Sequence, residues 1–192
     1  MTKNEFLQRF QLNALAKSTH NRTKENNTSK PIESAVLVAL TEQANQLSLV
    51  LTKRSSHLKH HPGQISFPGG KVEKNDKNLI ETALRETQEE IGIDPAYLDT
   101  IGQLHCYQTL TGFRITPIVA LVKPNSKIII DTNEVDEVFY LPIGHFINKQ
   151  NHLTVEIEQN TIRHKVLFIP YKHYNIWGAT AAIINDLSEH IR

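Results

Sequence analysis

The alternation of hydrophobic and polar positions divides the chain into strand-like and helix-like segments. Short apolar or alternating runs, which are typical of strands, lie at 34–41, 47–53, 65–67, 99–108, 113–123, 137–141, 152–158 and 162–169. Apolar residues at helical spacing lie at 5–17, 78–91 and 175–190. Because the five residues EQANQ, 42–46, separate the first two strands, we expect these strands to form a hairpin. Strands, a central helix, more strands and a terminal helix predict a layered α/β (α+β) fold.

The N-terminal region differs in composition from the rest of the chain. Residues 18–31 are polar and show no apolar periodicity, a pattern typical of a linker. Residues 1–31 contain six basic and two acidic side chains, and we interpret this excess as a solvated tail. We therefore expect an N-terminal helix and polar linker at 1–31 and one domain at 32–192.

The overall composition excludes several classes of protein. The 21 basic and 20 acidic side chains nearly balance, whereas a general nucleic-acid binder shows a basic excess. The single cysteine, Cys106, excludes an intrachain disulfide or a CxxC site, and we expect it to be buried within a strand. The longest apolar run, 35–40, is far shorter than the roughly 20 residues of a membrane span. Because the first residues also lack a secretory signal, we expect a cytoplasmic protein without membrane partners.

The predicted helix at 78–91 carries an unusual concentration of acidic residues. The residues Ile80, Leu84, Thr87 and Ile91 share one face, and the opposite side holds Glu86, Glu89 and Glu90. Like charges three or four residues apart destabilise a helix, and carboxylates near its C-terminus oppose the helix dipole. A divalent cation removes this conflict, since carboxylates at i and i+4 can reach one Mg²⁺. The alternative is an ordinary solvated acidic face, and the helix alone leaves both readings open.

A glycine pair precedes this helix. Residues 67–70 read FPGG, and paired glycines let the backbone approach a ligand closely. A phosphate-binding P-loop is excluded, because Lys71 is followed by Val72 rather than by Ser or Thr.

Residues 70–93, whose second half reads RETQEEIGI from Arg85, resemble the Nudix box. The first half is one residue longer than usual and places Lys77, next to Asp76, where the first glutamate of the box is expected. The resemblance implies a Nudix fold, a mixed β-sheet sandwiched between helices, that hydrolyses nucleoside diphosphates with Mg²⁺ or Mn²⁺. Motif position and i,i+4 spacing indicate Glu86 and Glu90 as metal ligands, and Glu89 is either a third ligand or the group that accepts a proton from water. The resemblance implies that the Gly70 carbonyl completes the metal shell. It further implies catalytic roles for Glu86, Glu89 and Arg85.

The preceding residues, 50–70, read VLTKRSSHLKHHPGQISFPGG and resemble the signature of the coenzyme A pyrophosphatase branch. That branch also has the longer box. The resemblance implies cleavage of coenzyme A and its derivatives to 3′,5′-ADP and 4′-phosphopantetheine. The expected substrate-binding residues are Arg54, Lys59, Gly63, Gly69 and Gly70. Lys59 stands where arginine is usual, which keeps the charge but loses the planar fork that grips phosphate.

Several alternatives stay open. The substrate could be another nucleoside diphosphate derivative, such as NADH or ADP-ribose, or the domain could bind a nucleotide without catalysis. Glu134 and Glu137 are alternatives to Glu89 as the general base. Tyr171, Tyr174 and Trp177 either stack on adenine or belong to the core. The expected partner is a small-molecule nucleotide, and a homodimer is left open.

Overall fold

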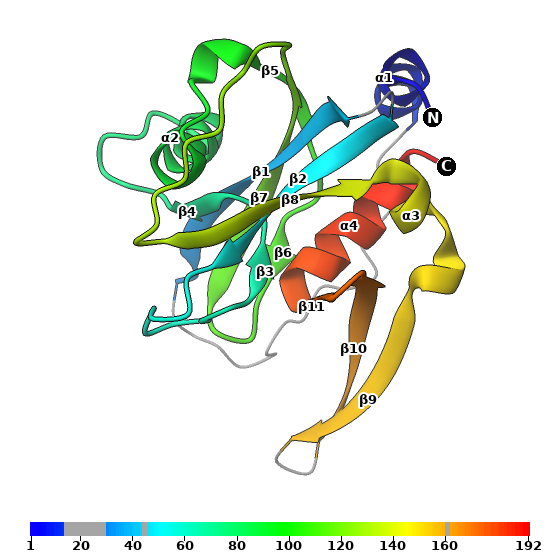
Figure 1. Ribbon diagram of the computed structural model, residues 1–192. Coiled ribbons are helices and arrows are strands. Elements are labelled where there is room, and N and C mark those ends of the chain that lie inside the picture. The colour runs from blue at the N-terminus through cyan, green and yellow to red at the C-terminus, as the bar shows by residue number, and fades with distance from the viewer. Residues whose placement is uncertain (14–29, 44–45, 160–161) are drawn as a thin grey trace.

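The computed structural model describes residues 1–13, 30–43, 46–159 and 162–192 and is drawn in Figure 1. Within this part of the chain the α-helices are α1 (Lys3–Leu12), α2 (Leu79–Ile91), α3 (Ile143–Ile147) and α4 (Gly178–His190), with 3-10 turns η1 (Pro95–Tyr97) and η2 (Lys149–Asn151). None of these helices is long and apolar enough to span a bilayer.

The main sheet is mixed. It contains β1 (Ile32–Gln43), β2 (Gln46–Arg54), β3 (Ile65–Ser66), β4 (Gly69–Lys71), β5 (Leu98–Gln103), β6 (Tyr107–Gln108), β7 (Phe113–Val122) and β8 (Val135–Pro142). The central path runs β3-β2-β1-β7-β5, with β4 on β1, β6 on β7 and β8 on β2. The β1–β7 pair is parallel, and the other pairs are antiparallel.

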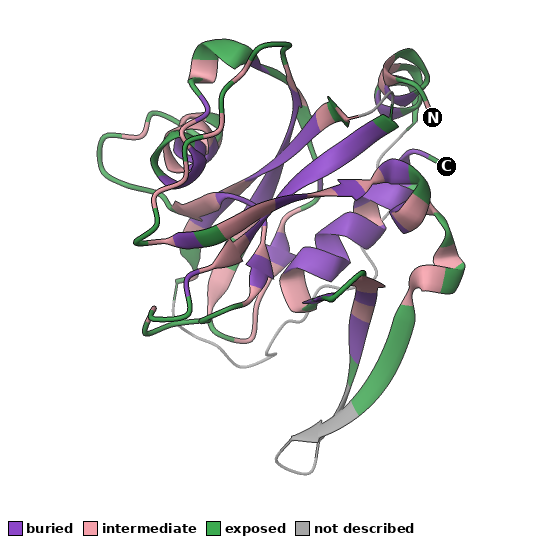
Figure 2. Ribbon diagram, in the orientation of Figure 1, coloured by how far each residue is buried: buried purple, intermediate pink, exposed green. Residues whose placement is uncertain are grey.

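A second sheet of three antiparallel strands extends from the main body (Figure 1). It consists of β9 (Leu153–Gln159), β10 (Ile162–Tyr171) and β11 (Tyr174–Trp177). Figure 2 shows that the described part of β9 is exposed, whereas most of β2 and of α4 is buried.

Helices cover both faces of the main sheet, because successive strand residues point to opposite faces and both sets are apolar. On one face, Leu37, Val50 and Ile118 pack with Ala83 and Ile91 of α2. On the other face, the core joins apolar residues of the sheet to α4 and α1. The predicted layered α/β (α+β) fold, a mixed sheet between helices, is therefore confirmed.

The predicted hairpin of β1 and β2 is confirmed, but several predicted boundaries are wrong. The single strand at 99–108 is two strands, β5 and β6, and the break lies where Leu104 bonds to the carbonyl of Pro117. Because proline has no N–H, it cannot return the second bond of a regular antiparallel pair. Cys106 lies in this break and is partly exposed, contrary to the expectation of a buried strand residue. The last helix begins at Gly178 rather than 175, because the residues before it pair as β11. The short helix α3 was not predicted.

The N-terminal helix α1 is part of the core rather than a solvated tail. Phe6 is fully buried and Phe10 nearly so, both in the core cluster that contains α4. The Arg9 guanidinium donates to the carbonyl of Ile191 at 3.1 Å, and Asn13 donates to that of His190 at 2.7 Å. The helix ends at Leu12, whereas the prediction extended it to 17. Most of the predicted linker lies outside the described residues, and the domain boundary at 31/32 stays a prediction.

Candidate active site

The helix α2 is held in place by local signals at both ends. The Asn78 side chain accepts the backbone N–H of Glu81 and caps the N-terminus, and Gly92 ends the helix with a left-handed φ of 69°. The apolar face differs from the predicted one, because Ile80 is 42% exposed. The buried residues are Thr82, Ala83, Thr87, Glu90 and Ile91. One of the three clustered glutamates, Glu90, therefore lies on the buried side of the helix.

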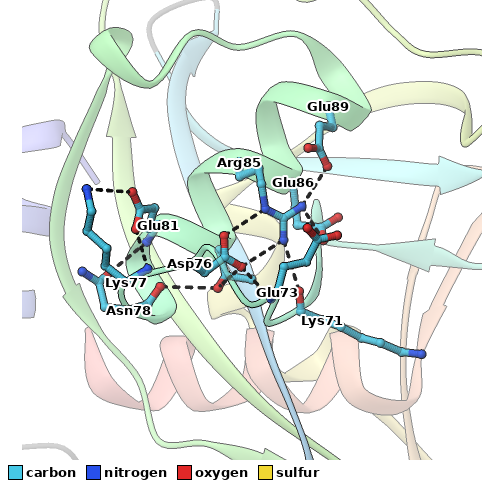
Figure 3. Close-up of polar contacts among 10 residues, drawn as sticks. Lys71, Glu73, Asp76, Lys77, Asn78, Glu81, Arg85, Glu86 and Glu89 are labelled. Carbon is cyan, nitrogen blue, oxygen red and sulfur yellow. Dashed lines mark hydrogen bonds and ion pairs between the residues drawn. The ribbon is translucent and has the colours of Figure 1, made fainter.

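Arg85 is the centre of a network of charged groups (Figure 3). Its Nε and Nη2 donate to the two oxygens of Asp76 at 3.0 and 3.1 Å. Its Nη1 lies 3.0 Å from Glu86 Oε1 and 2.9 Å from Glu89 Oε2. Because the Arg85 guanidinium stabilises the carboxylate, the pKa of Asp76 is held well below its usual range. Arg85 therefore pairs with the carboxylate cluster.

The contacts of Asp76 and Lys77 show which of these two neighbouring side chains belongs to the network around Arg85. Asp76 also accepts the hydroxyl of Thr82 at 2.9 Å and the N–H of Glu73 at 2.9 Å, so its carboxylate is anchored from several sides. The ammonium of Lys77 lies 3.6 Å from Glu81 and is exposed. Asp76 is thus the residue that orients Arg85. Sequence reasoning noted Asp76 but left its role undecided.

The glycine pair forms the short strand β4 against β1 and approaches the helix. A Cβ on Gly70 would lie 2.3 Å from the Glu86 carboxylate, so a side chain at this position would displace that carboxylate. A Cβ on Gly69 would lie 2.4 Å from the carbonyl oxygen of Ala35. The sheet therefore brings the Gly70 backbone directly against a predicted metal ligand.

Glu90 is a buried carboxylate with an unpartnered oxygen. The residue is 2% exposed, its Oε1 lies 3.6 Å from Nη1 of Arg54, and its Oε2 has no hydrogen-bond partner. Burial raises the pKa of Glu90 to about 8; Arg54 opposes the rise, and Glu134 and Glu86 add to it. Burial likewise raises the pKa of Glu86, against the effect of Arg85. Burial therefore disfavours the charged form of both carboxyl groups, and nearby positive charge favours it.

The carboxylates of α2 are suitable ligands for a divalent cation, but their side chains do not converge on one position. In the ranges that the structure describes, no three His, Cys, Asp or Glu side chains are placed to hold one ion. Glu86 and Glu90, one turn apart, supply hard oxygen ligands of the kind that Mg²⁺ prefers. The oxygen of Glu90 that lacks a hydrogen-bond partner suits such an ion. Glu89 is half-exposed and turned to Arg85.

Arg54, at the end of β2, lies 3.6 Å from Glu90 of α2. Lys59 and Gly63 lie in the exposed loop after β2, and no described contact joins either to the carboxylates. Gly63 has a φ of 67°, and its N–H donates to the Arg54 carbonyl at 3.1 Å, so this glycine closes the loop. Their expected contacts with substrate stay predictions.

The two alternative bases lie in different surroundings. Glu137 accepts a hydrogen bond from the Tyr174 hydroxyl, and Tyr174 is buried against the ring of Phe139 in the core on the α4 side. Glu134, by contrast, is close enough to raise the pKa of both Glu86 and Glu90. Its carbonyl accepts the N–H of Ser55 at 2.9 Å, which ties it to the end of β2. Of the two, Glu134 accompanies the carboxylate cluster.

A glutamate-bearing helix is thus packed against paired glycines on a mixed sheet between helices. The NUDIX domain model matches residues 31–162, and the chain belongs to this family. Nudix hydrolases act on diphosphate bonds and generally need divalent cations such as Mg²⁺ or Mn²⁺. The predicted membership of the Nudix family is therefore confirmed.

Individual relatives cover nearly the whole chain. It is 36% identical over 193 residues to the "Uncharacterized Nudix hydrolase NudL" of Enterobacter sp. (strain 638), covering 100% of this chain and 95% of the relative. The protein of that name from Klebsiella pneumoniae (strain 342) is 37% identical over 187 residues, covering 97% and 93%.

Solved structures share the fold at low sequence identity. The MutT protein from Methanosarcina mazei Go1 has a TM-score of 0.51 at 22% identity, covering 86% of this chain and 96% of that one. A MutT/nudix family protein from Enterococcus faecalis has a TM-score of 0.51 at 17% identity, covering 100% and 73%.

Proposed function

We propose that this Nudix hydrolase cleaves the diphosphate of coenzyme A and its derivatives to 3′,5′-ADP and 4′-phosphopantetheine, with Mg²⁺ or Mn²⁺. The observation that carries the proposal is the contact between Arg54 and Glu90, 3.6 Å apart. It joins the segment that resembles the coenzyme A pyrophosphatase signature to the carboxylates of the Nudix box. A polyanionic substrate suits a cationic segment next to a cation site.

Glu86 and Glu90 would hold the divalent cation, with Glu89 as a third ligand or as the group that accepts a proton from water. The cation would neutralise charge on the phosphoryl oxygens and acidify the attacking water. Arg85, anchored on Asp76, orients Glu86 and Glu89 through contacts of 3.0 and 2.9 Å. These roles explain why like charges are kept together on one helix despite their repulsion.

Glu134 is an alternative acceptor of that proton. Its carbonyl is fixed to the end of β2, and its charge acts on both Glu86 and Glu90. The choice between Glu89 and Glu134 is testable from the pH–rate profile, since removal of the general base eliminates the acidic limb of that profile.

The substrate specificity would come from the loop after β2. Lys59 is exposed in this loop and is our candidate for the 3′-phosphate, which distinguishes coenzyme A from dephospho-coenzyme A. The backbones of Gly63, Gly69 and Gly70 would allow close approach of the substrate.

The test is product analysis by mass spectrometry after incubation with coenzyme A, NADH and ADP-ribose, each with and without Mg²⁺ or Mn²⁺. Metal-dependent release of 4′-phosphopantetheine as the dominant product would support the proposal. Cleavage of NADH or ADP-ribose instead would keep the Nudix chemistry and reject the substrate. If none of the three is cleaved, the alternative of a domain that binds a nucleotide without hydrolysing it is favoured.

A further inference from the structure

Two arginines contact the carboxylates of α2, and they are held in different ways. Arg85 makes two hydrogen bonds to Asp76, at 3.0 and 3.1 Å, and one to the carbonyl of Lys71 at 3.2 Å. Arg54 lies 3.6 Å from Glu90, and no hydrogen bond between these two side chains is formed. In the described ranges, Glu90 is the one ion-pair partner of Arg54. Arg85 is therefore anchored in place, whereas Arg54 is held mainly by Coulomb attraction.

The backbone of Arg54 is fixed while its side chain reaches solvent. Its N–H donates to Gln64 at 2.9 Å, and its carbonyl accepts the N–H of Gly63 at 3.1 Å. Its side chain is 25% exposed, against 3% for that of Glu90. A change of rotamer thus moves the guanidinium without disturbing β2.

Glu90 has more capacity for positive charge than Arg54 supplies. Its Oε2 is buried without a partner, and the negative charges of Glu86 and Glu134 act on it as well. A divalent cation bound to Glu90 would neutralise the carboxylate and so weaken its attraction for Arg54. A guanidinium released beside a bound cation would face the position of a substrate phosphate, which arginine binds well through its forked donors.

We propose that Arg54 exchanges anions: it pairs with Glu90 in the cation-free protein and with a substrate phosphoryl oxygen once Glu90 ligates a divalent cation. This inference rests on the proposed function, since it assumes a phosphorylated substrate at this site. Its consequence is that Arg54 contributes to substrate binding only in the cation-loaded protein, which favours binding of the cation before the substrate.

The test measures binding rather than turnover, with the non-hydrolysable α,β-methylene analogue of ADP as the probe. Isothermal titration calorimetry gives the probe affinity of the wild type and of Arg54→Ala, in EDTA and in Mn²⁺. Arg54→Ala is expected to change the affinity less than twofold in EDTA and to weaken it at least tenfold in Mn²⁺. The control Lys59→Ala, which removes a charge away from Glu90, is expected to change both affinities by the same factor.

A second pair of variants changes Glu90, the partner of Arg54 in the cation-free protein. Glu90→Gln removes the carboxylate that pairs with Arg54, so the probe is expected to bind at least fivefold more tightly in EDTA than to the wild type. The double variant with Arg54→Ala is expected to lose this gain. Glu89→Gln removes an equal charge from the same helix and measures the general electrostatic effect, which we expect to be smaller.

Three results would overturn the exchange. Equal weakening by Arg54→Ala in EDTA and Mn²⁺ would make Arg54 a permanent phosphate ligand. No weakening in either condition would leave it as a counter-ion of Glu90 alone. A Mn²⁺-loaded wild type that does not bind the probe would also contradict it. Coenzyme A cleavage by the same preparation shows whether the proposed function stands when the exchange fails.

Discussion

Replacement of Asp76 by Asn tests whether the network around Arg85 depends on a buried charge. The Asp76 side chain is 3% exposed and that of Arg85 is 23% exposed, so neither is well solvated when the partner is lost. Removing one member of a buried ion pair costs about 3–5 kcal/mol. Because Arg85 is partly exposed and keeps Glu86 and Glu89, we expect Asp76→Asn to lower the free energy of unfolding by about 3 kcal/mol. For a chain of this size the loss corresponds to a fall of roughly 6–12 °C in the melting temperature.

Asp99→Asn is a matched control for this variant. Asp99 lies 3.0 Å from the Lys123 ammonium, the same separation as in the Asp76–Arg85 pair, but both side chains are about half exposed. Exposed ion pairs contribute about 0–1 kcal/mol. Urea unfolding of both variants compares the same chemical change in two environments.

The pH dependence of the free energy of unfolding tests whether the charge of Asp76 is responsible for this effect. The pKa of Asp76 is lowered in the folded protein. The Asp76 carboxylate therefore stabilises the fold fully at pH values above the pKa of an aspartate in the unfolded chain, about 3.9. This stabilisation is lost as the pH falls below that value, because the unfolded state then binds the proton first. The difference in the free energy of unfolding between the wild type and Asp76→Asn should therefore become smaller from pH 6 towards pH 3. A difference that does not change with pH, or a loss no larger than that of Asp99→Asn, would show that the charge of Asp76 does not support the network.

Three further predictions concern substitutions of single residues. Glu90→Gln should lower metal-dependent turnover by at least 100-fold without lowering the melting temperature, because a neutral amide suits the buried position; near-normal turnover would remove Glu90 from the site. Lys59→Ala should raise the KM for coenzyme A more than that for dephospho-coenzyme A, and equal increases would mean that Lys59 does not read the 3′-phosphate. Phe6→Ala should cost about 3–5 kcal/mol in urea unfolding, since Phe6 is fully buried, and a loss below about 1 kcal/mol would mean that α1 is not part of the cooperative core.

The helix α2 shows how far local reasoning reaches. Its start at Asn78, its end at Gly92 and the crowding of Glu86, Glu89 and Glu90 depend on residues within a few positions of each other. The sequence therefore predicted the helix and the carboxylates that would bind a cation. The buried face was partly wrong, since Ile80 is exposed and Glu90 is buried, because the sheet decides which side of a helix is covered.

Hydrophobic periodicity, helix caps and charge spacing determined the layered fold and the acidic helix, because each acts within one turn or one strand. Only the tertiary structure showed that Asp76 anchors Arg85, that Arg54 faces Glu90 and that Glu137 points to the opposite side of the sheet from Glu90. The β2–β8 register shifts between Lys53 and Arg54, and a shift of one residue turns a side chain to the other face. Such shifts depend on how segments distant in the sequence pair. The contacts of Arg54 and Glu137 are therefore determined by the β2–β8 pairing and not by their sequence neighbours.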